Sequence, residues 1–179
     1  MIRATVRRCA PALLAAAIIA AASPAAAAPP RDTPAPPTRP DLPLTSVAAG
    51  EACDFKLEVS GTGAKARVKT FRNGSQIISG KGFLATYTNV DTGESLTFET
   101  KGGAERTSAP DADNVVTVTA TGSNGLILFS TDMSEVPGVD APSAIQYTGR
   151  IVYTIDLDTG LFTLVSASGR QRDLCAELS

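Results

Sequence analysis

The stretch Ala144–Ser168, AIQYTGRIVYTIDLDTGLFTLVSAS, carries the clearest structural pattern in the chain. From Ile145 to Ile155 every second residue is apolar or glycine, a period of two that places one set of side chains on one face of a strand. The triplet Asp158-Thr159-Gly160 then supplies turn residues before a second run of strand-forming residues begins. The segment therefore predicts two antiparallel strands joined by a tight turn.

The same character extends over residues 51–179. Val, Ile, Thr, Phe and Tyr alternate with polar residues, and Gly, Asn and Asp separate the runs. The apolar residues show no convincing helical period, so the pattern indicates an antiparallel all-β domain. A segment of this length is sufficient for one hydrophobic core and too short for two.

About eight strands are predicted in this domain. They cover 55–59, 64–72, 75–90, 95–100, 115–121, 126–130, 144–156 and 161–168. Tight turns are predicted at Asn73-Gly74, Asp91-Thr92-Gly93 and Gly122–Gly125, whereas Gly80 and Gly82 predict a bend within one long strand. The segments 101–114 and 131–143 are the two long connections.

Eight strands in sequence order favour an up-and-down β-barrel, which removes exposed sheet edges by closing. A two-sheet β-sandwich with the same strands is the alternative. In a closed barrel the first and last strands are neighbours. If the number of strands is even, the last strand ends at the same end of the barrel at which the first strand begins. This arrangement would place Cys53 near Cys175 and gather the long connections at the same end.

The N-terminal residues 1–27 have the features of a secretory signal peptide. Arg3, Arg7 and Arg8 precede the uncharged stretch 10–22, which is too short to span a bilayer. The small residues 25–27 predict cleavage after Ala27. The pair Arg7-Arg8 leaves both the general secretory route and the twin-arginine route open.

Residues 28–50 follow as a predicted disordered, proline-rich linker. Seven prolines lie between positions 29 and 43, and they oppose regular helix or sheet while favouring extended polyproline II conformations. Few large apolar side chains are available to bury there, so no stable packing is expected.

The charge balance argues against two classes of partner. The chain has 16 basic and 18 acidic residues, and three of the arginines precede residue 28; the predicted mature chain therefore carries 13 against 18, a net charge of −5. Nucleic acids and anionic membranes both require a basic face, so neither is an expected partner. No membrane span is expected in the mature form.

Cys53 and Cys175 are the two cysteines of the predicted mature chain. An even number of cysteines in an exported protein indicates a disulfide, because the extracellular compartment is oxidising. The predicted location is therefore secreted and extracellular, with the proline-rich linker also compatible with attachment to the cell wall.

The chain contains no histidine, which excludes histidine-dependent nucleophile pairs and histidine metal sites. The triplet Asp-Thr-Gly occurs at 91–93 and 158–160 and resembles the two triplets of aspartic proteases. Glu94 and Leu161 follow the glycines where that family usually has a small residue, so turns are the preferred interpretation. No catalytic residue, metal site or cofactor is predicted.

Two pairs of residues are candidates for a binding role. Tyr147 and Tyr153 share one strand face and are expected in the core or as the lining of a barrel interior. Arg150 and Arg170 each follow a glycine and are expected at the surface, with a small anion site as the sharper hypothesis. Acidic residues at 111–114 and 156–158 lack the spacing of a calcium loop and are interpreted as turns.

The motif YTGRIVYTID at 147–156, the turn at 158–160 and the motif DLCA at 173–176 resemble a group of uncharacterised secreted proteins of high-GC Gram-positive bacteria. This resemblance implies an exported β protein and brings no activity with it.

The sequence leaves three hypotheses about function. The first is a secreted, non-enzymatic binding module for a small apolar ligand or an extracellular protein partner. The second is an isomerase or hydrolase that uses carboxylates without histidine. The third is a structural protein of the cell envelope. Ligand, oligomeric state and biological role are not encoded in any recognisable motif.

Overall fold

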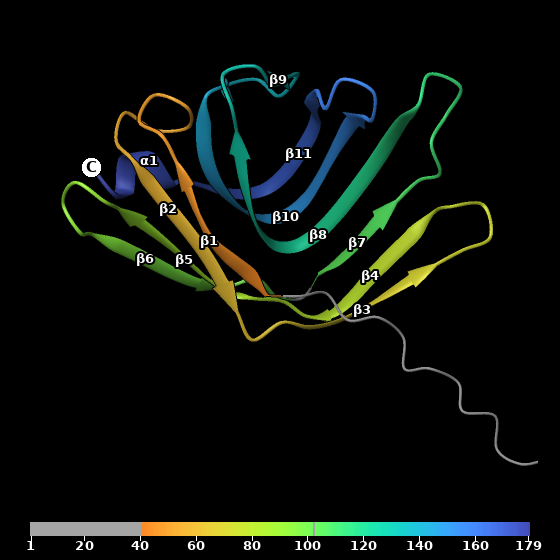
Figure 1. Ribbon diagram of the computed structural model, residues 1–179, viewed down its shortest axis with the longest axis horizontal. Helices are drawn as coiled ribbons and strands as arrows, with labels where there is room; N and C mark the ends of the chain where they lie inside the picture. Colours follow the sequence, from red (N-terminus) through yellow and green to blue (C-terminus); the bar gives the residue numbers. More distant parts are fainter. Residues whose placement is uncertain (1–40, 102) are drawn as a thin grey trace, which may run out of the picture. The chain divides into compact units, whose positions relative to one another are not determined.

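The computed structural model describes residues 41–101 and 103–179, and Figure 1 shows their arrangement. These residues form eleven strands and one short helix. The elements are β1 (Leu42–Val47), β2 (Leu57–Thr62), β3 (Lys65–Thr70), β4 (Gln76–Lys81), β5 (Leu84–Asn89), β6 (Ser95–Glu99), β7 (Ala104–Thr107), β8 (Val115–Leu128), β9 (Met133–Ser134), β10 (Ser143–Asp156), β11 (Phe162–Asp173) and α1 (Leu174–Glu177). The predicted signal peptide and residues 28–40 of the predicted linker lie outside the described residues.

The strands form two sheets. The four-stranded sheet has the order β1-β2-β5-β6, and the seven-stranded sheet has the order β3-β4-β7-β8-β10-β11-β9. Within the described residues neither sheet closes on itself, so the predicted closed barrel is wrong. The fold is all-β, and its two sheets agree with the sandwich alternative.

Strand β1 lies within the stretch predicted to be a disordered linker. It pairs with β2 from Val47↔Leu57 to Leu42↔Gly61, and the side chain of Val47 is buried. Pro43 is compatible with this strand because β1 is at the sheet edge and the register shifts beside it. The domain therefore begins before the predicted boundary at residue 51.

The predicted strand 75–90 changes sheet at Gly82. Its first half is β4 in the seven-stranded sheet, and its second half is β5 in the four-stranded sheet. The crossing is held by Thr100, whose N–H donates to the carbonyl of Phe83 at 2.8 Å and whose hydroxyl accepts from the N–H of Phe83 at 2.7 Å. A Cβ at Gly82 would lie 1.9 Å from the carbonyl oxygen of Thr100, so only glycine allows this approach.

The turn predicted at Gly122–Gly125 is wrong, because β8 continues through it as a strand of 14 residues. Gly122 pairs with Gly149 of β10, and Gly149 pairs with Gly169 of β11. This row of three glycines crosses the middle of the long strands, which are strongly curved in Figure 1. Glycine has no side chain, so the strands can bend at this row without a clash. The glycines that suggested a turn at 122–125 therefore mark a bend in a continuous sheet.

The buried apolar side chains form two clusters, one associated with each sheet. The first cluster joins side chains of the four-stranded sheet to the C-terminal segment and includes Leu57, Val59, Tyr87, Leu174 and Leu178. The second packs on the long strands and includes Leu126, Leu128, Tyr147, Ile151 and Leu164. Each fully buried leucine contributes roughly 1.5–3 kcal/mol through removal of apolar surface from water.

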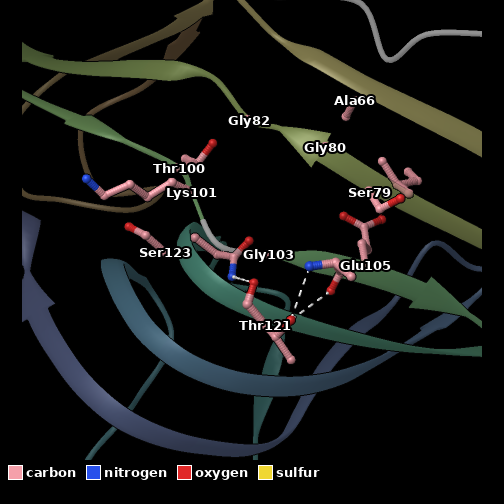
Figure 2. A pocket seen from close by; sticks show the side chains of 13 residues that line it. Ala66, Ser79, Gly80, Gly82, Thr100, Lys101, Gly103, Glu105, Thr121 and Ser123 are labelled. Carbon is pink, nitrogen blue, oxygen red and sulfur yellow. Dashed lines mark hydrogen bonds between the residues drawn. The ribbon is translucent and has the colours of Figure 1, made fainter.

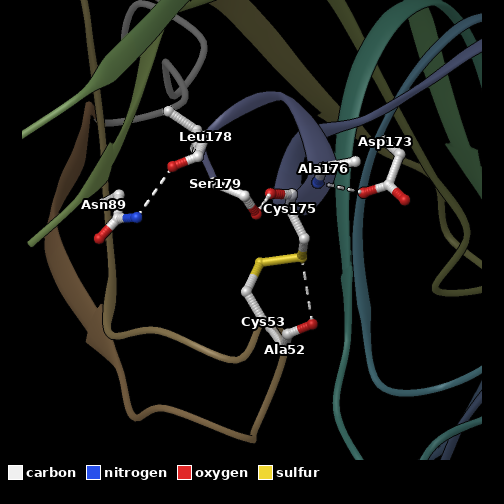
Figure 3. Close-up of a disulfide and its surroundings, with 8 residues drawn as sticks. All are labelled: Ala52, Cys53, Asn89, Asp173, Cys175, Ala176, Leu178 and Ser179. Carbon is white, nitrogen blue, oxygen red and sulfur yellow. Dashed lines mark hydrogen bonds between the residues drawn. A yellow bond between two sulfur atoms is a disulfide. The ribbon is translucent and has the colours of Figure 1, made fainter. Parts of the chain in front are cut away.

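The predicted disulfide between Cys53 and Cys175 is confirmed, with 5.3 Å between the two Cα atoms (Figure 3). It joins the segment before β2 to α1, the helix that follows β11, so it ties the four-stranded sheet to the end of the seven-stranded sheet. The buried side chain of Asn89 adds a second tie, because its amide donates to the carbonyl of Leu178 at 2.8 Å. No helix in the described part of the chain is long and apolar enough to cross a membrane.

The two long connections do not gather at the disulfide. Pro142 and Ser143, which end the second connection, lie beside both cysteines around one surface hollow. Asn114, which ends the first connection, instead binds Asp158 in the turn at the opposite end of β10. The prediction failed because the barrel parity on which it depended does not apply to two open sheets.

Candidate functional site

A cleft of about 410 Å³ lies between the two sheets. Its walls are mainly apolar and come from both sides. The four-stranded sheet and the crossing before it supply Leu42, Phe83, Ala85 and Tyr87, and the seven-stranded sheet supplies Ala120, Leu126, Ile151, Tyr153 and Phe162. The cleft is therefore bordered by side chains from strands of both sheets.

Aromatic rings form pairs along the walls. Tyr153 of β10 and Phe162 of β11 stack with their ring centroids 4.6 Å apart, and Tyr87 stacks on Phe98 with centroids 5.3 Å apart. Such pairs stabilise one another by about 0.5–1.5 kcal/mol beyond the burial of their surface. The stacking therefore holds Tyr87, Tyr153 and Phe162 in defined orientations at the cleft.

Tyr87 is the most deeply buried polar group of the cleft, with 5% of its surface exposed. Its hydroxyl lies against Gly125, where an added Cβ would come within 1.9 Å of the oxygen. Burial raises the pKa of Tyr87 to about 12, so the phenol remains neutral at physiological pH.

Two carboxylates also line the cleft. Asp41 is exposed, and one of its oxygens accepts a hydrogen bond from the backbone N–H of Ala64 at 3.0 Å. Glu105 is half-buried and projects from β7. No lysine or arginine belongs to the lining formed by the described residues, so the charged groups of this lining are all negative.

A smaller pocket of about 50 Å³ shares Thr100, Glu105 and Asn124 with the cleft (Figure 2). Beside it, the hydroxyl of Thr121 accepts from the N–H of Ala104 at 3.1 Å and donates to the Ala104 carbonyl at 3.2 Å. Three glycines at positions 80, 82 and 103 bring backbones close together around this pocket. Its size suits one or two water molecules rather than an organic ligand.

The predicted binding tyrosines differ in position. Tyr153 lines the cleft, whereas Tyr147 packs in the second core cluster and is absent from the cleft lining. The Tyr147 hydroxyl is buried without a hydrogen-bond partner among the described residues, and burial raises its pKa. Tyr147 therefore contributes its ring to packing rather than its hydroxyl to a site.

Arg150 and Arg170 lie exposed on the neighbouring strands β10 and β11. They are not directly opposite, because Arg150 pairs with Ser168 and Arg170 pairs with Thr148. Arg170 borders a shallow hollow together with Arg172, but Arg150 does not line this hollow. Arg172 is itself paired with Glu177, so the hollow does not bring the two predicted arginines together.

The two Asp-Thr-Gly triplets form turns of identical construction in different sheets. The turn preceding Gly93 is capped by the side chain of Asn89, which accepts from the N–H groups of residues 91 and 92. The turn preceding Gly160 is capped by Asp156, which accepts from those of residues 158 and 159. In both turns the threonine hydroxyl accepts from the residue after the glycine. The triplets serve hairpin geometry, as the sequence interpretation proposed.

The acidic residues near these turns accept hydrogen bonds from backbone or side-chain groups of nearby turns. Asp111 accepts from the N–H groups of Asp113 and Val115 at 3.0 and 2.9 Å, and Asp158 accepts from the amide of Asn114. Over residues 41–101 and 103–179, no group of three or more potential metal ligands is found. These carboxylates are therefore explained by turn formation.

Sequence reasoning missed Asp41, Phe83, Tyr87 and Glu105 as cleft residues. Asp41 and Leu42 fell in the predicted linker, and Phe83 lay within the predicted strand 75–90. The alternation of Phe83, Ala85 and Tyr87 was the available signal that these side chains share a face. Nothing local in the sequence indicated that this face borders a cleft.

Comparison of the chain with protein-family models, with curated proteins and with solved structures gave no match, so the cleft and its chemistry are interpreted from this structure alone.

Proposed function

We propose that this protein is an exported, non-enzymatic binding module that holds a small, mainly apolar ligand in the cleft between its two sheets. The observation that carries this proposal is the cleft itself. Its volume of about 410 Å³ falls within the range of roughly 300–1,000 Å³ typical of small-molecule sites. Its walls combine many apolar side chains with a few polar groups, which is the usual composition of such sites.

Export is supported by two features of the chain. The predicted signal peptide favours a location of the mature protein outside the cytoplasm. The disulfide between Cys53 and Cys175 is compatible with that location, because disulfides persist in oxidising compartments. A secreted module with a preformed cleft is suited to capture a ligand from the medium or the cell envelope.

The proposal is tested with the neutral, environment-sensitive dye Nile red and the mature protein. The variant Phe83→Ala removes one aromatic wall, and the variant Leu84→Ala is the matched control because Leu84 is exposed and does not line the cleft. We expect Phe83→Ala to weaken dye binding at least about fivefold, the effect of losing one buried contact of about 1 kcal/mol. Leu84→Ala should bind as the wild type does.

Two results would overturn this function. One is the absence of dye binding to the wild type, and the other is equal binding by the two variants when both remain folded. Native mass spectrometry of protein from the culture medium of its own host gives an independent measurement. A small molecule that co-purifies with the wild type and is lost in Phe83→Ala supports the proposal.

A carboxylate-based hydrolase or isomerase is the second candidate, because Asp41 and Glu105 line the same cleft. General acid–base chemistry without histidine requires such carboxylates. This candidate predicts turnover of a chromogenic ester or glycoside that Glu105→Gln abolishes while Nile red binding is unchanged. Turnover that Glu105→Gln leaves intact would exclude this residue as the catalytic carboxylate.

A further inference from the structure

We propose that the exposed face of the seven-stranded sheet binds a linear polymer that carries phosphate groups along its chain. This surface is separate from the cleft, because successive side chains of a strand point to opposite faces of a sheet. On β10, Ile151 is buried and lines the cleft, whereas the adjacent Arg150 is exposed. The proposal therefore goes beyond the proposed function and does not depend on it.

The strand register brings basic residues that are distant in the sequence to one side of this sheet. Lys69 of β3 and Arg106 of β7 both pair with Ile77 of β4, and Arg106 and Arg150 pair with threonines of β8 two residues apart. Directly paired residues share a face, and so do residues two apart on a strand. The basic face consists of the exposed residues Lys65, Arg67, Lys69, Arg106, Arg150 and Arg170.

The positive charge of the basic face is not balanced locally. None of its members forms an ion pair with a carboxylate of residues 41–101 or 103–179, whereas Lys81 and Arg172, at neighbouring positions, are paired with glutamates and are left out of this set. Among the described strand positions on this side, only Asp156 is acidic, and it caps the turn that follows β10. The negative net charge of the predicted mature chain therefore does not describe this surface, which can attract an anionic partner.

Each arginine of the basic face has a hydroxyl residue directly opposite it on a neighbouring strand. The pairs are Arg67 with Ser79, Arg106 with Thr119, Arg150 with Ser168 and Arg170 with Thr148. The Cβ atoms of such pairs are about 4.5–5.5 Å apart, so a guanidinium and a hydroxyl can donate to the same anion. Arginine, serine and threonine are among the side chains that contact phosphate oxygens, and the guanidinium fork matches phosphate geometry. The pairs therefore favour phosphate as the recognised group.

The spread of the charges favours a polymer over a single phosphate. Five strand spacings separate β3 from β11, which is roughly 24 Å along the sheet at about 4.8 Å per spacing. No aromatic residue occupies a strand position of this face in the described chain, although the ring of Phe71, beyond the end of β3, lies 4.9 Å from the Lys69 ammonium. Bases would therefore lack the row of stacking rings that single-stranded nucleic acids use, and we expect recognition of phosphates alone.

The test measures binding of the mature protein to end-biotinylated, long-chain polyphosphate by biolayer interferometry. Arg106→Gln/Arg150→Gln removes two charges from the basic face. The control Lys56→Gln/Lys101→Gln removes the same charge from residues outside the seven-stranded sheet. We expect the face variant to bind at least about fivefold more weakly, the scale of two exposed charge pairs, and the control to bind as the wild type does. The slope of log K against log salt concentration should also decrease in magnitude by about 1 in the face variant alone.

A second face variant, Lys65→Gln/Arg67→Gln, changes the edge strand β3 instead of the middle of the sheet. It should weaken polyphosphate binding as well, because the polymer is expected to cross the whole face. Thermal unfolding should be unchanged in every variant, since the substituted residues are exposed. If one face variant does not fold, the other decides. Unchanged binding by a folded face variant, or equal weakening by the control, would overturn the proposal.

Three competing probes identify the class of partner. Orthophosphate at the same phosphate concentration should leave polyphosphate bound, and displacement would show a single-anion site. Single-stranded DNA with the same number of phosphates should bind no more tightly than polyphosphate, and tighter binding would show recognition of bases. Phosphatidylglycerol vesicles that bind while polyphosphate does not would show a membrane surface. Each of these three results would overturn a linear phosphate polymer as the partner.

Failure of this proposal is distinguishable from failure of the proposed function. Both face variants should bind Nile red as the wild type does, because their substituted side chains do not line the cleft. Nile red binding without polyphosphate binding overturns the basic face as a site and leaves the cleft function standing. Polyphosphate binding without Nile red binding supports the basic face and overturns the cleft function.

Discussion

Gly149 of β10 and Gly169 of β11 are directly paired across the seven-stranded sheet, with their backbones in close contact. A Cβ at Gly149 would lie 2.0 Å from the carbonyl oxygen of Ser168, and a Cβ at Gly169 would lie 2.3 Å from that of Thr148. The sheet therefore bends at a place where side chains are sterically excluded on two adjacent strands. The repeated Gly-Arg step of the sequence is explained by its glycines, not by its arginines.

Alanine at this pair should destabilise the protein. We expect Gly169→Ala to lower the free energy of unfolding by at least about 2 kcal/mol, because the added Cβ meets the backbone and φ at this residue is 108°. Urea unfolding measures the change. Gly160→Asn is the control, since it lies in open space in a left-handed turn that asparagine tolerates. A cost for Gly169→Ala no larger than that of the control would contradict the steric argument.

The equivalent caps Asn89 and Asp156 predict different responses to pH. Hydrogen bonds from the backbone of Thr159 and Asp158 lower the pKa of Asp156 below its usual 3.8. The folded state thus prefers the ionised cap, and this stabilisation is present above the unfolded pKa and lost as pH falls through the folded one. Asp156→Asn keeps the cap without its charge, so it lacks this pH-dependent stabilisation. As the pH falls from 5 to 2, the free energy of unfolding of the variant should therefore increase relative to that of the wild type. A pH-independent difference in urea unfolding would disprove the linkage.

The reverse substitution at the other turn, Asn89→Asp, should destabilise the fold. Asn89→Asp removes the amide that donates to the Leu178 carbonyl and places a carboxylate in a site that is 2% exposed. We expect a loss of about 1–3 kcal/mol in the free energy of unfolding at neutral pH, the cost of leaving a buried carbonyl unpaired. Because Asp156→Asn keeps its cap and loses only the charge, it should cost less at pH 7 than Asn89→Asp, and the two exchanges form a matched pair. Equal effects would show that burial of the cap is irrelevant.

Removal of the disulfide should separate the C-terminal helix from the four-stranded sheet. The bridge closes a loop of 122 residues, for which chain entropy gives about 4–5 kcal/mol of stabilisation. The double variant Cys53→Ser/Cys175→Ser should lose a large part of this, measured by thermal unfolding. Wild type treated with reductant should unfold at the temperature of the variant, and a melting temperature unaffected by either change would refute the assignment.

Deletion of the Tyr147 hydroxyl should not weaken the fold. This oxygen is buried without a partner in the described part of the molecule, so Tyr147→Phe should leave the free energy of unfolding unchanged or raise it by about 1 kcal/mol. Thr121→Val is the contrast, because it deletes a hydroxyl that makes two hydrogen bonds with Ala104 and should cost about 1–3 kcal/mol. If Tyr147→Phe proves as costly as Thr121→Val, the hydroxyl has a partner in solution.

Local sequence was sufficient for many individual elements. The turns at Asn73-Gly74, Asp91–Gly93 and Asp158–Gly160 lie where their residue types predicted them, because turn geometry depends on a few adjacent residues. Long strands in the last third followed from their alternation. The failures were at glycines inside strands: Gly82 moves the chain to another sheet, and Gly122 bends β8 without interrupting it.

Sequence by itself thus determined an all-β chain, most of its hairpin turns and the pairing of its two cysteines, since each follows from local propensity or from simple counting. Only the tertiary structure decided that the strands divide into two open sheets and that residues from Asp41 to Phe162 meet around one cleft. Whether a glycine turns, bends or transfers a strand depends on the backbone that packs against it, such as Thr100 beside Gly82 and Ser168 beside Gly149. Those contacts join residues distant in the chain, and no local pattern encodes them.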